Sequence, residues 1–397
     1  MELKEKTPHT ILNEIIEDFN ATNDKGITVN AISQGSIVDL NKKVISAAQS
    51  NSLPAIINVY PDVATGLIED KKLVNLSSFI NDKNVGMADE MDDFVDTFIE
   101  ETSQWGEGEV YGLPMTKSTE VLYVNKNMLE SLGYTLEDLE DLTFEKLAEI
   151  SNKAVTELGV AGFGFDSSSN AFISSLKMDG LDFVDSKGTI NVDNEWVREY
   201  MTFFQKQAES GAFRIAGEDK FLSNPFVNQK MLCYQGSSAG YAYLNNDGAF
   251  EIAVVEVPVF EGKDKAVMQQ GASLFVTNNV SAEAQYAAYE FVKFATNAEN
   301  TAKFATATGY LPVRKSAIET EIVKNILNDE TSLYSQVYNV AQKSLPYAYY
   351  TPAINNAQSA RTVAQEKYEA FMSGSITDVE VLVDDIVSQV QTSIGRN

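Results

Sequence analysis

The stretch that decides the fold is YGLPMTKSTEVLYVNKNMLESLGY, residues 111–134. Two apolar runs, at 110–114 and 120–124, indicate strands that bracket the segment 115–119. Upstream of them, the nearly continuous apolar run at 55–60 suits a strand buried in a parallel sheet. Strands of this kind, separated by helical patterns, predict an α/β protein.

The N-terminal quarter repeats this alternation. Apolar residues at spacings of three and four predict a helix over 10–20, and the alternating residues of 27–32 predict a short strand. A second helix is expected over 38–48, ahead of the strand at 55–60. Together these elements form a β–α–β unit, which 70–80 closes.

The remainder of the chain continues in the same way. A strand pair is expected at 252–257 and 273–276, joined by the charged turn FEGKDK, and a turn at 309–312 follows the helices before it. Since strands and helices alternate throughout, we expect an α/β fold with mainly parallel sheets. Helices are expected at 144–158, 195–210, 225–231, 282–296, 301–306 and from 357 onward.

Length and charge limit the classes of function. A chain of 397 residues with 44% hydrophobic side chains is two to three times the size of a typical domain, so two lobes are expected. Its 57 acidic and 30 basic residues give a net charge of −27, which opposes nucleic-acid binding and favours a soluble monomer.

Few residues for catalysis are present. The only histidine is His9 and the only cysteine is Cys233, so His-based triads, His-ligated zinc, disulfides and multi-cysteine metal sites are excluded. No P-loop or dinucleotide motif occurs, and we expect neither a cofactor nor a bound metal. The acidic pairs 92–93 and 384–385 suit solvated helix faces better than the opposed carboxyls of a glycosidase. The sequence therefore predicts a protein that is not an enzyme.

Three phrases carry a resemblance: YGLPMTKSTEVLYVNKNMLESLGY at 111–134, GASLFVTNN at 271–279, and EFVKFATNAENTAKFATATGYLPVRKSA at 290–317. With LPAIINVYPDVATGLIEDKKLVNLSSFI at 53–80 before them, they are similar, in order, to extracellular solute-binding proteins of bacterial ABC importers. That family includes maltose-binding and glycerol-3-phosphate-binding proteins, and the phrases most resemble the glycerol-3-phosphate branch.

The resemblance implies a type II periplasmic-binding-protein-like fold, with two discontinuous lobes joined by three hinge crossovers and a ligand cleft between them. It assigns 1–115 and 272–312 to lobe 1, and 116–271 and 313–397 to lobe 2. Relatives begin with a short apolar strand, whereas here a helix begins almost at once. Either that strand is missing from the sequence or the charged leader replaces it.

The family's ligand residues can be carried over where motifs match. Ser118 matches the serine of the phrase ST-VLY-NK, Gly271 opens GASL, Tyr310 lies in TGYLP, and Arg361 precedes the final helix. An arginine fork, hydroxyls and a glycine N–H suit a phosphate group. The structural alternatives are a surface arginine, a core tyrosine and a serine that forms a turn. A paired serine motif is matched by Ser237 or Ser238.

Other positions depart from the branch. Its tyrosine near Ser36 is replaced by Ile37, its acidic residue after Tyr60 is Pro61 with Asp62 following, and its tryptophans near Gly164 give way to Phe165 and polar residues. Three tyrosines of the loop PYAYYTPA are expected either to stack on a sugar or to pack the lobe junction: Tyr347, Tyr349 and Tyr350.

The leading interpretation is a receptor that captures a glycerol-phosphate-like or glycerophosphodiester solute and delivers it to membrane permease subunits. A neutral oligosaccharide is the close alternative ligand. A carbohydrate-active enzyme and an adhesion protein that has lost transport are the rivals from other classes. The first residues lack the apolar core of a signal peptide. An extracellular, lipid-anchored or periplasmic location is therefore inferred from the resemblance.

Overall fold

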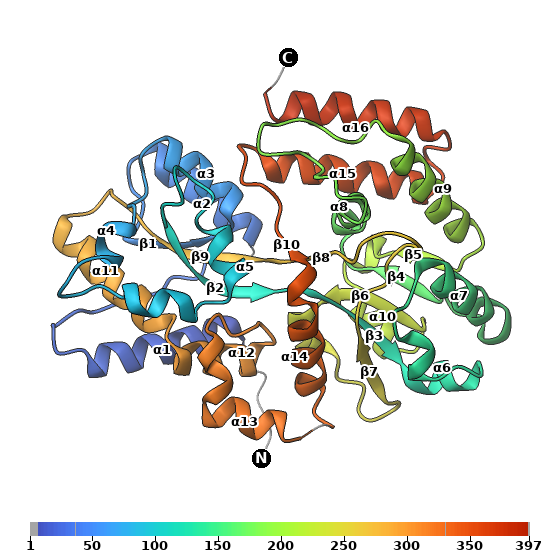
Figure 1. Cartoon of the computed structure of the whole chain (residues 1–397), viewed down its shortest axis with the longest axis horizontal. Helices are drawn as coiled ribbons and strands as arrows, with labels where there is room; N and C mark the ends of the chain where they lie inside the picture. Colours follow the sequence, from blue (N-terminus) through green and yellow to red (C-terminus); the bar gives the residue numbers. More distant parts are fainter. Residues whose placement is uncertain (1–6, 36, 330, 396–397) are drawn as a thin grey trace. The chain divides into compact units, whose positions relative to one another are not determined.

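The computed structural model describes residues 7–35, 37–329 and 331–395, which divide into two compact units. Unit 1 takes its described residues from Met1–Ser118 and Gln270–Asp329, and unit 2 from Thr119–Gln269 and Glu330–Asn397. The chain therefore passes from one unit to the other three times. Figure 1 shows the elements of both units.

Unit 1 is built on a three-stranded sheet in the order β1-β9-β2. Strand β9 (Gln270–Val276) lies at the centre and runs antiparallel to both β1 (Ile56–Val59) and β2 (Gly112–Ser118). Its helices are α1 (Pro8–Thr22), α2 (Ile37–Gln49), α3 (Pro61–Glu69), α4 (Ser77–Ile80), η1 (Ala88–Asp93), α5 (Asp96–Glu101), α11 (Ala282–Ala295), α12 (Ala298–Thr308), η5 (Lys315–Glu319) and α13 (Glu321–Leu327).

Unit 2 contains a five-stranded sheet in the order β5-β4-β6-β3-β7. Strands β5 (Phe213–Ile215), β4 (Phe163–Phe165) and β6 (Cys233–Ser237) are parallel, whereas β3 (Glu120–Asn125) runs antiparallel to β6 and to β7 (Ile252–Val255). A second, two-stranded sheet pairs β8 (Val267–Met268) with β10 (Ala348–Tyr349). The α/β class is confirmed, but the two larger sheets are not mainly parallel: the sheet of unit 1 is antiparallel, and the five-stranded sheet of unit 2 is mixed.

The helices of unit 2 cover its five-stranded sheet. Helix α15 (Ala357–Met372) packs on both α8 (Ser168–Lys177) and α16 (Val379–Ser393). The others are α6 (Lys126–Ser131), η2 (Leu136–Leu139), α7 (Phe144–Leu158), α9 (Glu195–Glu209), η3 (Gly217–Asp219), α10 (Ser223–Val227), η4 (Ser238–Tyr243), α14 (Leu333–Ser344) and η6 (Leu345–Tyr347).

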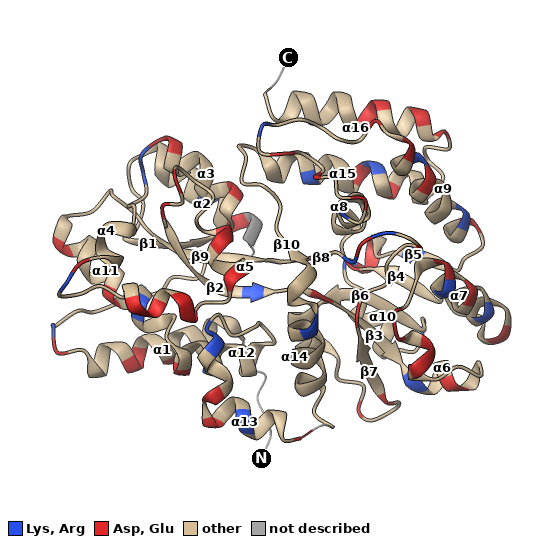
Figure 2. Ribbon diagram, viewed as in Figure 1, with Lys and Arg blue, Asp and Glu red and all other residues tan. Residues whose placement is uncertain are grey.

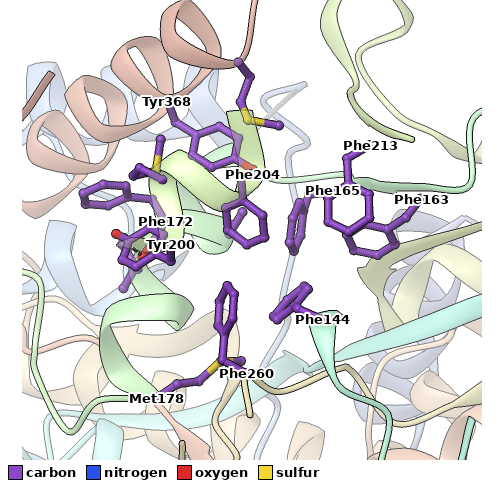
Figure 3. Close-up of a cluster of buried hydrophobic side chains, with 14 of the residues drawn as sticks. Phe144, Phe163, Phe165, Phe172, Met178, Tyr200, Phe204, Phe213, Phe260 and Tyr368 are labelled. Atoms are coloured by element: carbon purple, nitrogen blue, oxygen red, sulfur yellow. Dashed lines mark hydrogen bonds between the residues drawn. The ribbon is translucent and has the colours of Figure 1, made fainter. Parts of the chain in front are cut away.

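Aromatic rings fill the core of unit 2 beneath these helices. The ring of Phe144, from α7, lies 4.5 Å from that of Phe260 and 5.3 Å from that of Phe204. Figure 3 shows further rings converging from strands and helices, including Tyr368 of α15. Tilted and edge-to-face aromatic pairs of this kind stabilise the core beyond the free energy of area burial.

Two predictions about strands are wrong: the single strand at 27–32 and the strand pair at 252–257 and 273–276. Residues 27–32 form no strand in the described chain; the side chains of Asn20 and Asn23 bond the backbone of Val29 and Ile27 instead. The expected pair at 252–257 and 273–276 is not a hairpin. β7 pairs with β3 in unit 2, whereas β9 pairs in unit 1.

The segment 313–329, assigned to the second lobe on the resemblance, belongs to unit 1 in the structure. Leu311 bridges to Lys117 of β2, and the carbonyl of Val313 accepts a hydrogen bond from Val95. The Arg314 guanidinium lies 3.8 Å from the ring centroid of Phe94 and donates to the carbonyls of Thr296 and Glu90.

Cys233 is a buried free thiol, as expected, and it donates to the Gly162 carbonyl at 3.1 Å. Burial raises the pKa of this thiol far above its ordinary value. Four charged residues of the described chain are buried: Glu101, Lys117, Glu120 and Arg314. Figure 2 shows acidic residues spread over helices of both units rather than gathered on one element.

Candidate functional site

The carboxyl ends of the parallel strands of unit 2 form one edge of its sheet. Asp166 follows β4 directly, and Ser167 then caps α8 by accepting the Asn170 N–H at 3.2 Å. Because β3 runs in the opposite direction, its first residue, Glu120, lies at the same edge, opposite Ser237 of β6. Edges of this kind are the usual ligand-binding positions of α/β sheets.

A buried hydrogen-bond chain crosses this edge. The Glu120 carboxylate is 4% exposed and accepts from Asn170 Nδ2 and from Gln235 Nε2, each at 2.8 Å. The other end of Asn170, its Oδ1, accepts from the Arg361 guanidinium. Four residues from β3, β6, α8 and α15 are thereby joined.

Of the ligand residues predicted from the sequence, Arg361 is the one that belongs to this hydrogen-bond chain. Its Nη2 also lies 3.4 Å from Ser169 Oγ, in the first turn of α8. Tyr349 shares a small hollow of about 20 Å³ with Arg361, which is space for about one water molecule. The Tyr349 hydroxyl is 2.9 Å from Ser174 Oγ, and Lys177 Nζ lies 5.6 Å from its ring centroid.

Burial and charge shift the pKa values at this edge. Burial raises the pKa of Asp166 to about 6, against the backbone hydrogen bond from Leu222, and the charge of Glu120 adds to the rise. Burial also raises the pKa of Glu120, while its amide partners and Arg361 oppose the rise. The Glu120 carboxyl is thus linked to the Arg361 guanidinium through the neutral amide of Asn170, whereas the Asp166 carboxyl accepts the Leu222 N–H.

The paired serines lie beside the same edge. Ser238 is fully buried, and its backbone N–H donates to the Thr119 carbonyl at 2.7 Å while its hydroxyl lies 3.3 Å from the Thr119 N–H. Ser237 is partly exposed and caps η4 through Ala239. Ser237 is therefore the better placed of the two to meet a solute.

In unit 1, three predicted residues gather around Lys117. Lys117 pairs with Gly271 across the β2–β9 ladder and with Leu311, which follows Tyr310, so Ser118, Gly271 and Tyr310 are neighbours. The Tyr310 ring also packs on Phe304, at 5.6 Å between centroids.

Lys117 itself is fully buried. Its ammonium pairs with the Glu101 carboxylate and donates to the Gly271 carbonyl at 3.1 Å. Gly271 has φ +128°, and a Cβ there would come within 1.8 Å of the Thr116 oxygen. Only glycine fits this close approach of the two strands.

The remaining predicted residues are not brought into either group. Asp62 lies in the first turn of α3, where its Oδ1 accepts from the Val63 N–H, and Ser36 lies outside the described residues. The Phe165 ring is 4% exposed and packs at 4.7 Å from Phe163 in the aromatic core (Figure 3), so we leave it out of the proposed site.

Sequence reasoning missed Glu120, Asn170 and Gln235. A carboxylate at the start of an otherwise apolar strand was a usable signal for Glu120, because a buried charge needs partners. The two amides had no such signal, since they lie at positions 50 and 115 residues further along the chain.

No three His, Cys, Asp or Glu residues of the described chain gather as metal ligands would. Within the same described residues, no helix is both long and apolar enough to cross a membrane.

The chain crosses three times between two α/β units, which is the architecture of type II periplasmic solute-binding proteins. The chain belongs to the family described as "Bacterial extracellular solute-binding protein", whose model matches residues 14–329. The fold class and the family expected from the three sequence phrases are both confirmed.

Several proteins with low sequence identity are similar to this chain, and two of the solved structures share its fold. The sn-glycerol-3-phosphate-binding periplasmic protein UgpB of Pectobacterium atrosepticum is 22% identical over 353 residues, covering 85% of this chain and 78% of its own. The crystal structure of UgpB from Mycobacterium tuberculosis with glycerophosphocholine has a TM-score of 0.83 and 19% identity, over 99% of this chain and 97% of its own. Lmo0181 of Listeria monocytogenes, an ABC substrate-binding protein solved with cycloalternan, has a TM-score of 0.82 and 16% identity over the same shares.

Proposed function

We propose that this protein is the substrate-binding component of an ABC importer and captures a glycerol-phosphate-like or glycerophosphodiester solute. The observation that carries the proposal is Arg361, held by Asn170 and Ser169 at the carboxyl edge of the unit 2 sheet. An arginine there, at the first turn of α8, offers a cation and helix N–H groups to an anion. The UgpB relatives, named for sn-glycerol 3-phosphate, support the same solute class.

Ser237 and Tyr349 in unit 2, with Ser118, Gly271 and Tyr310 in unit 1, are the other ligand residues that we propose. Each lies beside Arg361, at the same sheet edge, or beside Lys117. Hydroxyls and a backbone N–H supply neutral donors for phosphate and glycerol oxygens.

A neutral oligosaccharide is the second candidate solute. Two exposed rings in unit 2 favour it: Phe221, 64% exposed just before α10, and Tyr243, 69% exposed at the end of η4. Apolar rings in solvent are suited to stacking on a sugar face, and Asp166 adds a carboxylate for its hydroxyls. Lmo0181, solved with cycloalternan, has the same fold.

The partners follow from this role. The protein acts outside the cytoplasmic membrane as a monomer, free or lipid-anchored, and docks on permease subunits. It performs no chemistry on the solute, because closure around a ligand followed by handover needs none.

A thermal-shift screen with one matched variant tests the proposal. Glycerol 3-phosphate, glycerophosphocholine and maltotriose are added to the natural chain and to Arg361→Ala. A ligand at 100 times its Kd stabilises the folded state by about 2.7 kcal/mol. We expect the phosphate compounds to raise the Tm of the natural chain and to lose that effect in Arg361→Ala.

The control is Arg198→Ala, which removes a unit 2 arginine paired at the surface with Asp193 and Glu380. It should keep the full response to phosphate compounds. A shift with maltotriose alone assigns the oligosaccharide instead, and a phosphate shift that survives Arg361→Ala rejects the site.

A further inference from the structure

The direction of each hydrogen bond in the buried chain of unit 2 is fixed by one residue. An ionised carboxylate only accepts, so Glu120 requires the NH₂ group of Asn170 to point toward it. The Asn170 carbonyl oxygen is then turned to Arg361, whose guanidinium only donates. The NH₂ group of Gln235 donates to the other carboxylate oxygen of Glu120.

Burial fixes these donor and acceptor directions. The exposed fractions are 4% for Glu120, 1% for Asn170 and 3% for Gln235, so water cannot replace a lost partner cheaply. Turning the Asn170 amide over would bring its oxygen to a carboxylate and its NH₂ group to a guanidinium. Both contacts would be repulsive, and the amide therefore has a single orientation.

Asn170 also separates two opposite charges. A carboxylate in direct contact with Arg361 would neutralise the guanidinium, and an incoming anion would have to compete with it. The neutral amide oxygen fixes the guanidinium without cancelling its charge. Glu120 acts on Arg361 through this spacer.

We propose that Glu120 and Asn170 are positioning residues for Arg361, with Asn170 serving as a neutral spacer that keeps the Glu120 carboxylate out of direct contact with the arginine that binds the anionic group of the solute. This inference rests on the proposed function for its affinity prediction. Its geometric part concerns the ligand-free protein alone.

The first variant is Glu120→Gln, which keeps the shape of the side chain but lets either end face Asn170. The Arg361 Nη signals in nitrogen–proton NMR spectra, identified by their loss in Arg361→Lys, report how freely the guanidinium rotates. We expect slow rotation in the natural chain and fast rotation, with broadened signals, in Glu120→Gln. Affinity for glycerophosphocholine, measured by titration calorimetry, should fall about tenfold, which corresponds to about 1.4 kcal/mol.

The second variant is the double change Glu120→Gln with Asn170→Asp, which reverses the polarity but keeps the net charge. The amide introduced by the first substitution can then donate to the carboxylate introduced by the second, and that carboxylate accepts from Arg361. The slow Arg361 rotation should therefore return. Affinity for glycerophosphocholine should stay at least about tenfold low, because a carboxylate now neutralises the arginine. Full recovery of affinity would reject the spacer role.

Glu149→Gln is the matched control, because Glu149 is an exposed unit 2 carboxylate bonded to Tyr134 and Lys146. It should change neither measurement. An Arg361 spectrum that is the same in Glu120→Gln as in the natural chain would overturn the positioning role. If the natural chain binds no phosphate compound, the proposed function fails, while the ligand-free spectra still decide whether Glu120 positions Arg361.

Discussion

At the scale of single residues, Asp166 links the candidate site to pH. The folded protein holds the Asp166 proton up to about pH 6, whereas the unfolded chain releases it near 3.8. Between these values the folded state binds more protons, so the stability that this residue contributes is full below pH 3.8 and is lost as the pH rises to 6.

Asp166→Asn removes this dependence while keeping an oxygen that can accept the Leu222 N–H. Relative to the natural chain, the variant should gain about 1 kcal/mol of unfolding free energy when the pH is raised from about 5 to about 7.5. Urea unfolding at the two pH values measures the gain. Asp247→Asn, at an exposed turn residue, is the control and should give no gain. An equal difference at both pH values would contradict the assignment.

At the scale of elements, one buried ion pair fastens α5 to β2. Lys117→Met would remove the ammonium that compensates Glu101, itself 5% exposed, and should destabilise unit 1 by about 3–5 kcal/mol. Replacing both, with Lys117→Met and Glu101→Leu, should cost less than Lys117→Met alone, since no buried charge then remains.

Chemical denaturation of the three proteins tests this order of stability. Lys126→Met is the control, because its pair with Glu251 lies at the surface of unit 2, and it should change stability by about 1 kcal/mol at most. A double variant less stable than Lys117→Met would show that the ion pair does not set the cost.

Elements whose signals are local could be predicted from the sequence. Helix α7 has the predicted bounds, because Thr143 caps its first turn, apolar residues line one face, and Gly159 ends it in the left-handed conformation. Helix α8 was missed, since five of its ten residues are Ser or Asn, which favour caps and turns over helix interiors.

Elements that depend on distant partners could not be predicted. The strand expected at 27–32 has the right alternation, but a strand needs a neighbour, and asparagine side chains bond its backbone instead. The pairing of β9 with β1 and β2 joins residues more than 150 positions apart. The hydrogen-bond chain of Glu120, Asn170, Gln235 and Arg361 also depends on distant partners. Motif matches identified Arg361, but the polar residues that bond to it come together only in the folded protein.

At the scale of the whole molecule, the excess of acidic over basic residues is the dominant electrostatic property. With 57 acidic and 30 basic side chains, at least 27 carboxylates have no cation to pair with one to one. Acidic residues are spread over both units (Figure 2), so their repulsion acts across the whole surface and destabilises the compact state.

Salt has two opposing effects on such a molecule, since it weakens both surface ion pairs and repulsion. Exposed pairs contribute only about 0–1 kcal/mol each, whereas repulsion sums over the excess carboxylates. Raising ionic strength from about 0.01 to 0.15 M shortens the screening length from about 30 to 8 Å. We therefore expect Tm to rise with sodium chloride at about pH 7.5. Near the pI of about 4.4, where positive and negative charges balance, the same salt should leave Tm unchanged or lower it. A Tm that falls with salt at the higher pH would mean that the surface ion pairs outweigh the repulsion.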